Sequence, residues 1–248
     1  MSGCNIWEPT GGANALRQLL TLGWYEAHVA GKAVGDLWWT KNPATGRMTS
    51  WHDLSGNGRA LTNAVVTGPW MTAVGSNTVA RCVADSYVER NAPEFTGKTA
   101  LTMVCVTTPT DATSLMLASW STFGHALYHN ANTMRFYTNT GTYGVTPALS
   151  GSPTLLTMRY DGTQPTDATR QRVRVNGAPV ALTYVGVVPA SIPLVAGTGL
   201  SLGDTSTHAA GFDFAGHLMA YCIVFRVLSD AEVLKAETAL RQLIGGLP

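Results

Sequence analysis

Residues 217–228, HLMAYCIVFRVL, decide the fold of this chain. Successive side chains of a strand point to opposite faces, and here both sets of alternating residues are apolar. One set is Met219, Tyr221, Ile223, Phe225 and Val227, and the other is Leu218, Ala220, Cys222, Val224 and Leu228. A strand of this kind is covered on both faces, so we expect it in the middle of a sheet and not at an edge.

The residues that follow, SDAEVLKAETALRQLI, predict a helix. Ser229 is a favourable N-cap residue, and Glu232, three positions later, completes a capping box. Gly245 and Gly246 provide a C-terminal stop. Residues at helical spacing lie between these signals: Val233, Leu234, Glu237, Leu240 and Leu243. The chain therefore closes with a central strand and an amphipathic helix.

Composition limits the class of protein. A chain of 248 residues that is 45% apolar can bury one core as a single domain. Only 12% of its residues are charged and the net charge is +1, which argues against nucleic-acid binding. Cys4, Cys82, Cys105 and Cys222 form no C-x-x-C pair, and buried free thiols are favoured over disulfides.

Targeting signals are not found. The start of the sequence, MSGCNIWEPTGG, lacks a basic region followed by an apolar run, so we expect no signal peptide and synthesis in a host cytoplasm. No window reaches the roughly 18 apolar residues of a membrane span.

The rest of the chain predicts many short strands. Apolar runs are separated by clusters of Gly, Pro, Asn and Asp, which is typical of a sandwich or barrel. Asp161-Gly162 and Asn176-Gly177 are strong turn signals within residues 154–177. Before the first strand, Asn14 to Leu20 predict a short helix that ends at Gly23.

Residues 51–61, WHDLSGNGRAL, predict a tight corner. Its centre consists of turn-forming residues that tolerate positive φ or bond their own backbone: Asp53, Ser55, Gly56, Asn57 and Gly58. Trp51 and Leu61 anchor its two sides. A glycine-rich loop can also cradle a phosphate, but no helix follows and no Lys occupies the P-loop position, so the structural interpretation is favoured.

These motifs together resemble the laminin-G-like jelly rolls of the concanavalin A-like lectin and glucanase superfamily. The resemblance covers about residues 22–243: Trp24 to Ala27, the 51–61 corner, the 154–177 hairpin, Leu200 to Asp204 and the closing strand and helix. It implies an all-β fold, an antiparallel β-sandwich jelly roll with a short N-terminal helix and a C-terminal helix. Residues 1–21 would form an N-terminal arm and the short helix, and residues 22–248 the jelly-roll domain.

Catalytic patterns are weak. The retaining glucanases of this superfamily carry a pattern like E-x-D-x-x-E, which this sequence lacks. Asp85 and Glu89 share one strand face but lie ~13 Å apart, too far for either glycosidase geometry, so we expect a solvated face. His125 and His129 have zinc-like spacing, but their neighbours predict a strand. We therefore expect no catalytic residues and no enzymatic activity.

Calcium is a further possibility that the resemblance raises, since laminin-G-like domains often hold one on their rim. The loop acids Asp53, Asp204 and Asp213 are weak calcium candidates, because no ordered Asp-x-Asp calcium loop is present. Our expectation is that the protein needs no cofactor.

Aromatic residues provide the remaining binding signal. Seven lie in or near predicted turns, where a ring can stack on a sugar, although core packing explains most of them. They are Trp38, Trp39, Trp70, Trp120, Tyr128, Tyr137 and Tyr143. We select five as glycan-binding candidates: Trp38, Trp39, Trp70, Trp120 and Tyr143.

The resemblance also suggests a function. Members without an export signal or hydrolase carboxylates resemble virion structural proteins of tailed bacteriophages: capsid decoration proteins, head fibres or tail appendages. We expect a non-enzymatic protein of this kind in the virion, a homo-oligomer that contacts capsid or tail proteins. Residues 2–12 would be an anchoring arm or an ordinary frayed terminus. The alternatives are a carbohydrate-binding adhesin or lectin for host glycans and, ranked last, a polysaccharide hydrolase or lyase.

Overall fold

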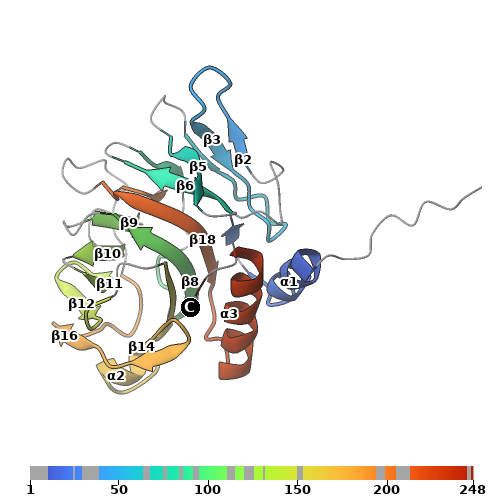
Figure 1. Ribbon diagram of the computed structural model, residues 1–248. Helices are drawn as coiled ribbons and strands as arrows, with labels where there is room; N and C mark the ends of the chain where they lie inside the picture. The colour runs from blue at the N-terminus through green and yellow to red at the C-terminus, as the bar shows by residue number, and fades with distance from the viewer. Residues whose placement is uncertain are drawn as a thin grey trace, which may run out of the picture.

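The computed structural model describes most of the chain in fourteen pieces (Figure 1). The described residues are 11–24, 26–29, 39–63, 68–74, 77–83, 86–91, 95–110, 115–119, 126–130, 132–149, 153–193, 199–204, 213–244 and 247. Within them, two antiparallel sheets contain all the strands, and three helices accompany them.

The first sheet has eight strands within the described residues. Their spatial order is β15 (Ala178–Val180), β14 (Gln171–Val175), β13 (Thr154–Asp161), β8 (Ala100–Pro109), β18 (Gly216–Val224), β6 (Asn77–Cys82) and β5 (Trp70–Val74). The eighth, β1 (Glu26–Val29), also pairs with β18. The predicted hairpin is present as β13 and β14, and Asn176 and Gly177 adopt the positive φ of the next turn.

The second sheet has ten strands in the same described part of the chain. Their order is β16 (Thr183–Val185), β12 (Thr142–Val145), β11 (Thr133–Asn139), β10 (Ala126–Asn130), β9 (Leu115–Ser119), β17 (Gly199–Leu202), β7 (Val88–Asn91), β4 (Leu61–Thr62), β3 (Met48–Trp51) and β2 (Trp39–Lys41). Buried residues of both sheets form one hydrophobic cluster between them. Sheet-on-sheet packing of this kind defines a sandwich.

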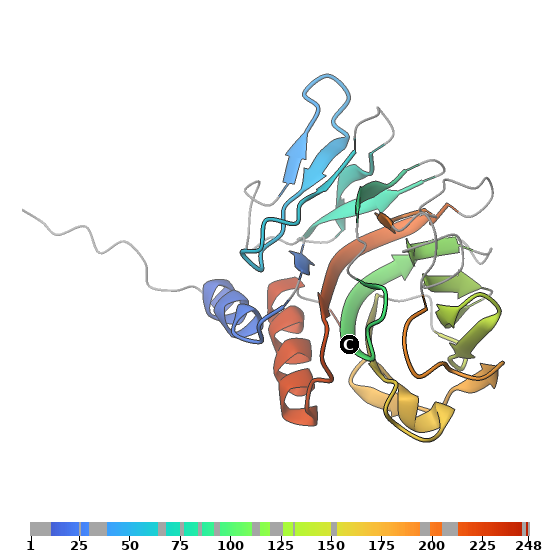
Figure 2. The ribbon, with the colours of Figure 1, turned by 180° about the vertical axis from the view of Figure 1, so that it is seen from behind.

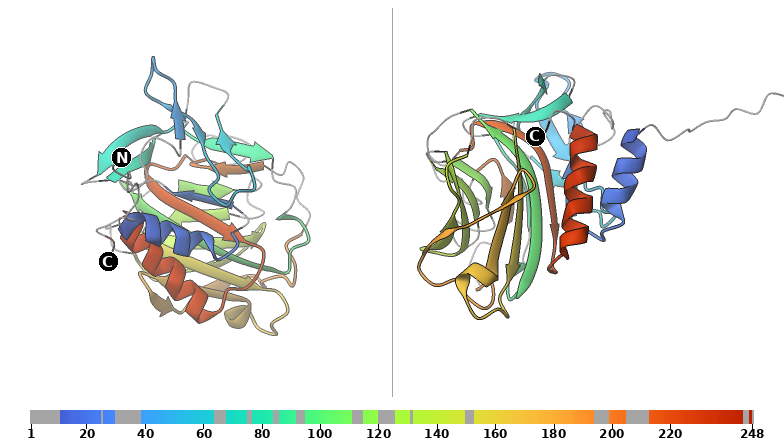
Figure 3. Two further views of the ribbon diagram at one scale, coloured as in Figure 1. Left: turned by 90° about the vertical axis from the view of Figure 1, so that its right-hand side faces the viewer. Right: turned by 60° about the horizontal axis from the view of Figure 1, so that its bottom comes forward.

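Strand β18 is central, as its sequence predicts. It pairs with β8 from Gly216 to Val224, and on its other side with β6 at its start and with β1 further along. All of its residues from Leu218 to Val224 are buried. One face of the strand contributes to the core between the sheets, and α3 (Asp230–Ile244) lies against the other face of this sheet (Figure 3).

Helix α3 begins with the predicted capping box. The Glu232 carboxylate accepts hydrogen bonds from the Ser229 backbone N–H (2.8 Å) and hydroxyl (2.9 Å), and the Glu232 N–H donates back to Ser229 Oγ (3.3 Å). Glu237 in its middle is fully buried and accepts hydrogen bonds from Thr157 and Arg174. The helix is thereby fixed to β13 and β14.

Helix α1 (Gly11–Leu20) packs on the outer side of α3 (Figure 3). Ala15 and Leu19 are fully buried in the main core, and the Trp24 indole donates to the Leu19 carbonyl (2.8 Å). The helix starts three residues earlier than predicted, because packing against α3 compensates for the low helix propensity of Gly11 and Gly12.

One helix was not predicted. The single turn α2 (Asp167–Arg170) sits in the connection between β13 and β14, next to the Asp161-Gly162 turn. It is too short to give a periodic sequence signal, and it forms from local hydrogen bonds such as the one from the Thr166 N–H to Thr169 Oγ1 (3.2 Å).

The predicted fold class is confirmed: the protein is an antiparallel β-sandwich with a short N-terminal and a C-terminal helix.

Cys82, Cys105 and Cys222 are buried free thiols, as expected, and burial raises the pKa of the first two to about 12. Cys4 lies outside the described residues. No helix in the described part of the chain has the length and apolarity to cross a bilayer. The domain boundary after residue 21 stays a prediction.

Candidate functional site

The 51–61 corner is built around the carboxylate of Asp53. It accepts hydrogen bonds from the backbone N–H groups of Ala27 (3.0 Å), Ser55 (2.9 Å) and Arg59 (3.1 Å), and from the Ser55 hydroxyl (2.8 Å). Burial alone would raise the pKa of Asp53, but these donors outweigh it and hold the pKa below its usual value. The Asn57 amide donates to the carbonyl of Trp24 (3.2 Å), so the corner also positions the chain just before β1.

This geometry gives a pH dependence. A carboxyl whose pKa is lowered in the folded state stabilises the protein above its unfolded pKa of about 4, and that stabilisation is lost as the pH falls through the folded pKa. We therefore expect the free-energy difference between wild type and Asp53→Asn to be largest above pH ~4 and to shrink below it. Urea unfolding at several pH values measures this difference. A difference that stays constant down to acid pH would contradict the assignment.

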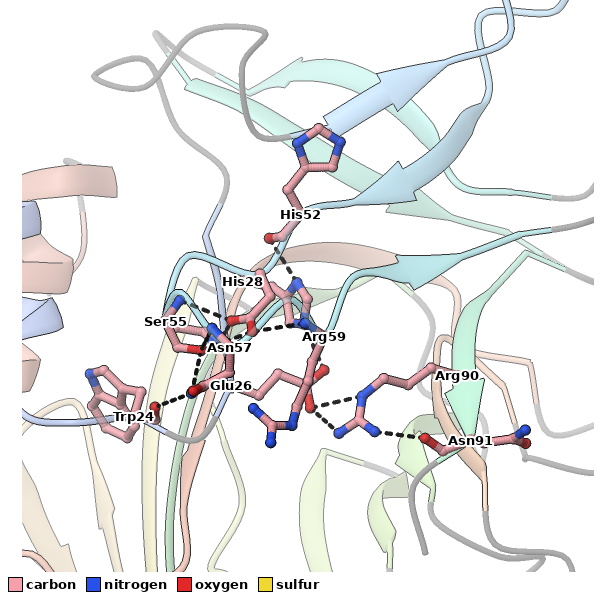
Figure 4. A network of polar contacts seen from close by, with 11 residues as sticks. Trp24, Glu26, His28, His52, Ser55, Asn57, Arg59, Arg90 and Asn91 are labelled. Carbon is pink, nitrogen blue, oxygen red and sulfur yellow. Dashed lines mark hydrogen bonds and ion pairs between the residues drawn. The ribbon is translucent and has the colours of Figure 1, made fainter. Parts of the chain in front are cut away.

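A second polar cluster lies deeper, between the two sheets (Figure 4). It consists of Glu26 and His28 on β1 and Arg90 on β7. Glu26 and His28 are fully buried. His28 Nε2 lies 2.7 Å from Glu26 Oε1, and Arg90 donates to Glu26 Oε2 from Nε (3.1 Å) and Nη2 (2.5 Å). One carboxylate therefore joins a histidine of its own strand to an arginine of the opposite sheet.

Both ring nitrogens of His28 have a polar neighbour. Its Nδ1 lies 3.0 Å from the carbonyl oxygen of His52, and its Nε2 lies 2.7 Å from Glu26 Oε1. His28 also lies directly opposite Tyr221 of β18, whose pKa is raised well above its usual value by burial.

This buried cluster was missed by the sequence reasoning. A signal was present, because Glu26 and His28 have the same parity in the short strand EAHV, all four residues of which are buried. Nothing in the sequence indicates that Arg90, 64 residues away, reaches them. Since Glu26 and His28 have no exposed surface, the cluster links the sheets and does not present reactive groups to a substrate.

The predicted calcium candidates do not come together. Within the described residues, no three His, Cys, Asp or Glu side chains are close enough to hold a metal ion. The carboxylate oxygens of Asp53 accept the hydrogen bonds of the 51–61 corner. Asp204 is 2% exposed, and Asp213 is partly buried. Whether the protein binds calcium stays untested.

Only two of the four weak catalytic candidates lie within the described residues. Glu89 lies on β7 and His129 on β10, in strands as expected, whereas Asp85 and His125 lie outside the described residues. His129 is 1% exposed, so it belongs to the interior.

The five aromatic candidates separate into different environments. Trp38 and Trp120 lie outside the described residues. Trp39 is buried, opposite Trp51 in the β2–β3 pair, so its ring offers no free face to a sugar. Trp70 is 37% exposed at the start of the edge strand β5, and the Arg47 guanidinium carbon lies 4.6 Å from its ring centroid.

Tyr143 is part of a cluster that the sequence did not predict as a unit. It lies opposite Tyr137 across the β11–β12 pair, with ring centroids 4.5 Å apart, and Tyr137 makes an edge contact with Tyr128 of β10 at 6.1 Å. Met134 and Phe136 of β11 point into the core, so the alternate residues Arg135 and Tyr137 point to the outer face of the sheet.

Arg135 completes this tyrosine–arginine cluster, which we define as Tyr128, Arg135, Tyr137 and Tyr143. Its guanidinium carbon lies 5.7 Å from the Tyr128 ring centroid and 5.2 Å from that of Tyr143. Figures 1 and 2 place strands β10, β11 and β12 on the side of the molecule away from α1 and α3. Arg135, Tyr137 and Tyr143 are partly exposed, whereas Tyr128 is buried.

Comparison with known proteins gives structural neighbours only. No family model and no curated protein sequence matches the chain. A Trypanosoma rangeli sialidase in complex with sialic acid matches over 94% of this chain and 38% of its own, with a TM-score of 0.60 and 11% identity. The covalent-intermediate structure of the same sialidase matches over 89% and 33%, with a TM-score of 0.58 and 13% identity. A receptor binding domain matches over 91% and 53%, with a TM-score of 0.55 and 7% identity.

At these identities the likeness establishes the β-sandwich fold alone. The chain spans a third to two fifths of the length of the sialidases that it matches. These neighbours nevertheless contradict our expectation of a protein without enzymatic activity, because the proteins that share its fold include enzymes. That expectation relied on the missing E-x-D-x-x-E pattern, on the separation of Asp85 and Glu89, and on the strand context of His125 and His129. These patterns describe only some classes of hydrolase, so their absence does not exclude the others.

Proposed function

We propose that this chain is a carbohydrate-binding β-sandwich and that it holds a glycan on the tyrosine–arginine cluster. The observation that carries the proposal is the pair of tyrosine rings, Tyr137 and Tyr143, on the outer face of the second sheet. Tyrosine combines an apolar ring with a polar hydroxyl, which suits a sugar with an apolar face and hydroxyl edges.

Two further observations support this proposal. Arg135 lies among the rings and supplies hydrogen-bond donors next to the stacking surface. The neighbours that share the fold include a sialidase in complex with sialic acid and a receptor binding domain. The fold thus occurs in an enzyme with a bound sugar acid and in a receptor binding domain, and fold alone does not assign the site.

A glycan array with purified protein tests the proposal. Tyr143→Ala is expected to weaken binding about tenfold, since a lost stacking contact of about 1.4 kcal/mol corresponds to that factor. Tyr143→Phe keeps the ring and should keep most of the affinity. Trp70→Ala is the matched control, because Trp70 is also an exposed aromatic residue with an arginine over its ring.

Two results would contradict the proposal. The first is an array with no signal above background for the folded wild-type protein. The second is binding that survives Tyr143→Ala and is lost in Trp70→Ala, which would move the site to the edge strand β5. Chromatography of the bound glycans after incubation should accompany the array, because the sialidase neighbours make cleavage a question that binding data alone do not answer.

A place on a bacteriophage virion stays a separate proposal, as do contacts with capsid or tail proteins and a homo-oligomeric state. It is supported only by the resemblance of the sequence motifs. Co-sedimentation with purified capsids or tails tests it, and deletion of residues 2–12 tests the suggested anchoring arm.

A further inference from the structure

The arginine of the tyrosine–arginine cluster carries a charge that no carboxylate among the described residues neutralises. Its Nη2 donates to the Asn130 side-chain oxygen (3.2 Å), and its Nε is buried without a hydrogen-bond partner. The guanidinium lies over the rings of Tyr128 and Tyr143. A buried donor without an acceptor costs free energy.

Four arginines among the described residues pair with carboxylates: Arg90 with Glu26, Arg159 with Asp230, Arg174 with Glu237 and Arg226 with Glu232. No carboxylate of the described part of the chain lies within ion-pair distance of Arg135. Its guanidinium can therefore pair with an anion that comes from outside the chain.

Given the proposed function, on which this step rests, we infer that the bound glycan is an acidic sugar and that Arg135 binds its carboxylate. The planar guanidinium fork matches a carboxylate with two parallel N–H donors. The rings of Tyr128 and Tyr143 reduce the access of water to the guanidinium, which strengthens such a pair. The adjacent rings of Tyr137 and Tyr143, tilted by 34° to each other, are placed to contact the sugar that carries the charge.

The hydroxyl of Tyr137 supports this arrangement. Burial raises the pKa of Tyr137, and the neighbouring Arg135 lowers it in part, so the net pKa stays above its usual value. The phenol is therefore uncharged at neutral pH and does not neutralise Arg135.

Isothermal titration calorimetry with matched ligands tests the inference. We would use sialyllactose with lactose, and an oligogalacturonate with its methyl ester, so that each acidic sugar has a neutral counterpart. Wild type should bind at least one acidic sugar about tenfold or more tightly than its counterpart. Arg135→Gln should abolish this preference and leave the weak binding of the neutral sugar unchanged, while Arg135→Lys should retain part of it.

Arg172→Gln is the matched control, because Arg172 is an exposed arginine on β14 of the other sheet. It should bind like wild type at equal salt concentration. If Arg172→Gln and Arg135→Gln weaken the binding of acidic sugars equally, the attraction is a general charge effect and the assignment to Arg135 is overturned.

The remaining outcomes separate this inference from the proposed function. Equal affinity for acidic and neutral sugars, unaffected by Arg135→Gln, would overturn the inference and leave glycan binding in place. Sulfated glycans that bind as tightly as carboxylated ones would overturn the carboxylate assignment. Binding of no sugar by the folded protein would overturn the proposed function itself.

Discussion

Glu26→Gln should lower the free energy of unfolding by about 3–5 kcal/mol, which is the usual cost of removing one partner of a buried ion pair. The substitution keeps the shape of the side chain but removes its negative charge and replaces one carboxylate oxygen by an NH2 donor, so either Arg90 or His28 loses its acceptor. Urea unfolding followed by tryptophan fluorescence measures the change. If Glu26→Gln does not fold at all, Arg90→Met provides the second measurement.

A double-mutant cycle makes this prediction specific. Glu26→Gln combined with Arg90→Met should cost less than the sum of the two single changes, because the second change removes a charge that the first leaves unpaired. The matched control is the exposed pair Arg226 and Glu232, where Arg226→Gln should cost about 1 kcal/mol or less. Equal losses at the buried and the exposed pair would show that the Glu26 cluster does not link the sheets.

Trp51→Ala is expected to destabilise the protein by about 3–5 kcal/mol, as deletions of large buried rings do. Trp51 is fully buried on β3, between Trp39 of β2 and Leu61 of β4, and its ring centroid lies 5.6 Å from that of His28. The cavity would open beside both the corner and the buried cluster. Thermal and urea unfolding of the variant measure the effect.

Two further variants control for this prediction. Trp70→Ala removes an equally large ring that is 37% exposed, and it should cost about 1 kcal/mol or less. Trp51→Phe keeps an aromatic ring and removes an indole N–H that has no hydrogen-bond partner among the described residues, so it should cost less than Trp51→Ala. Similar losses for Trp51→Ala and Trp70→Ala would contradict the role assigned to Trp51.

Much of the fold follows from local sequence patterns. The two-sided apolar run 217–228 predicts a central strand, which is β18, although the regular strand ends at Val224. The Ser229 and Glu232 capping box predicts the start of α3 within one residue. These predictions succeed because side-chain periodicity and helix caps depend on residues only a few positions apart.

The candidate site follows from the sequence only in part. Tyr143 could be selected as an aromatic residue near a turn, but Trp39, selected on the same ground, is buried. Proximity to a turn does not determine to which face of a sheet an aromatic ring points. That depends on strand register, since a shift of one residue moves every side chain to the opposite face.

The sequence by itself determined that this chain forms an antiparallel β-sandwich with a helix at each end, because strand, turn and cap signals are local. Only the tertiary structure decided which charged residues meet. It brings Arg90 to Glu26 across the core, and it places Arg135 among tyrosines with no carboxylate of the described residues within ion-pair distance. These contacts join different strands, and their formation depends on sheet order and packing, which short-range patterns do not specify.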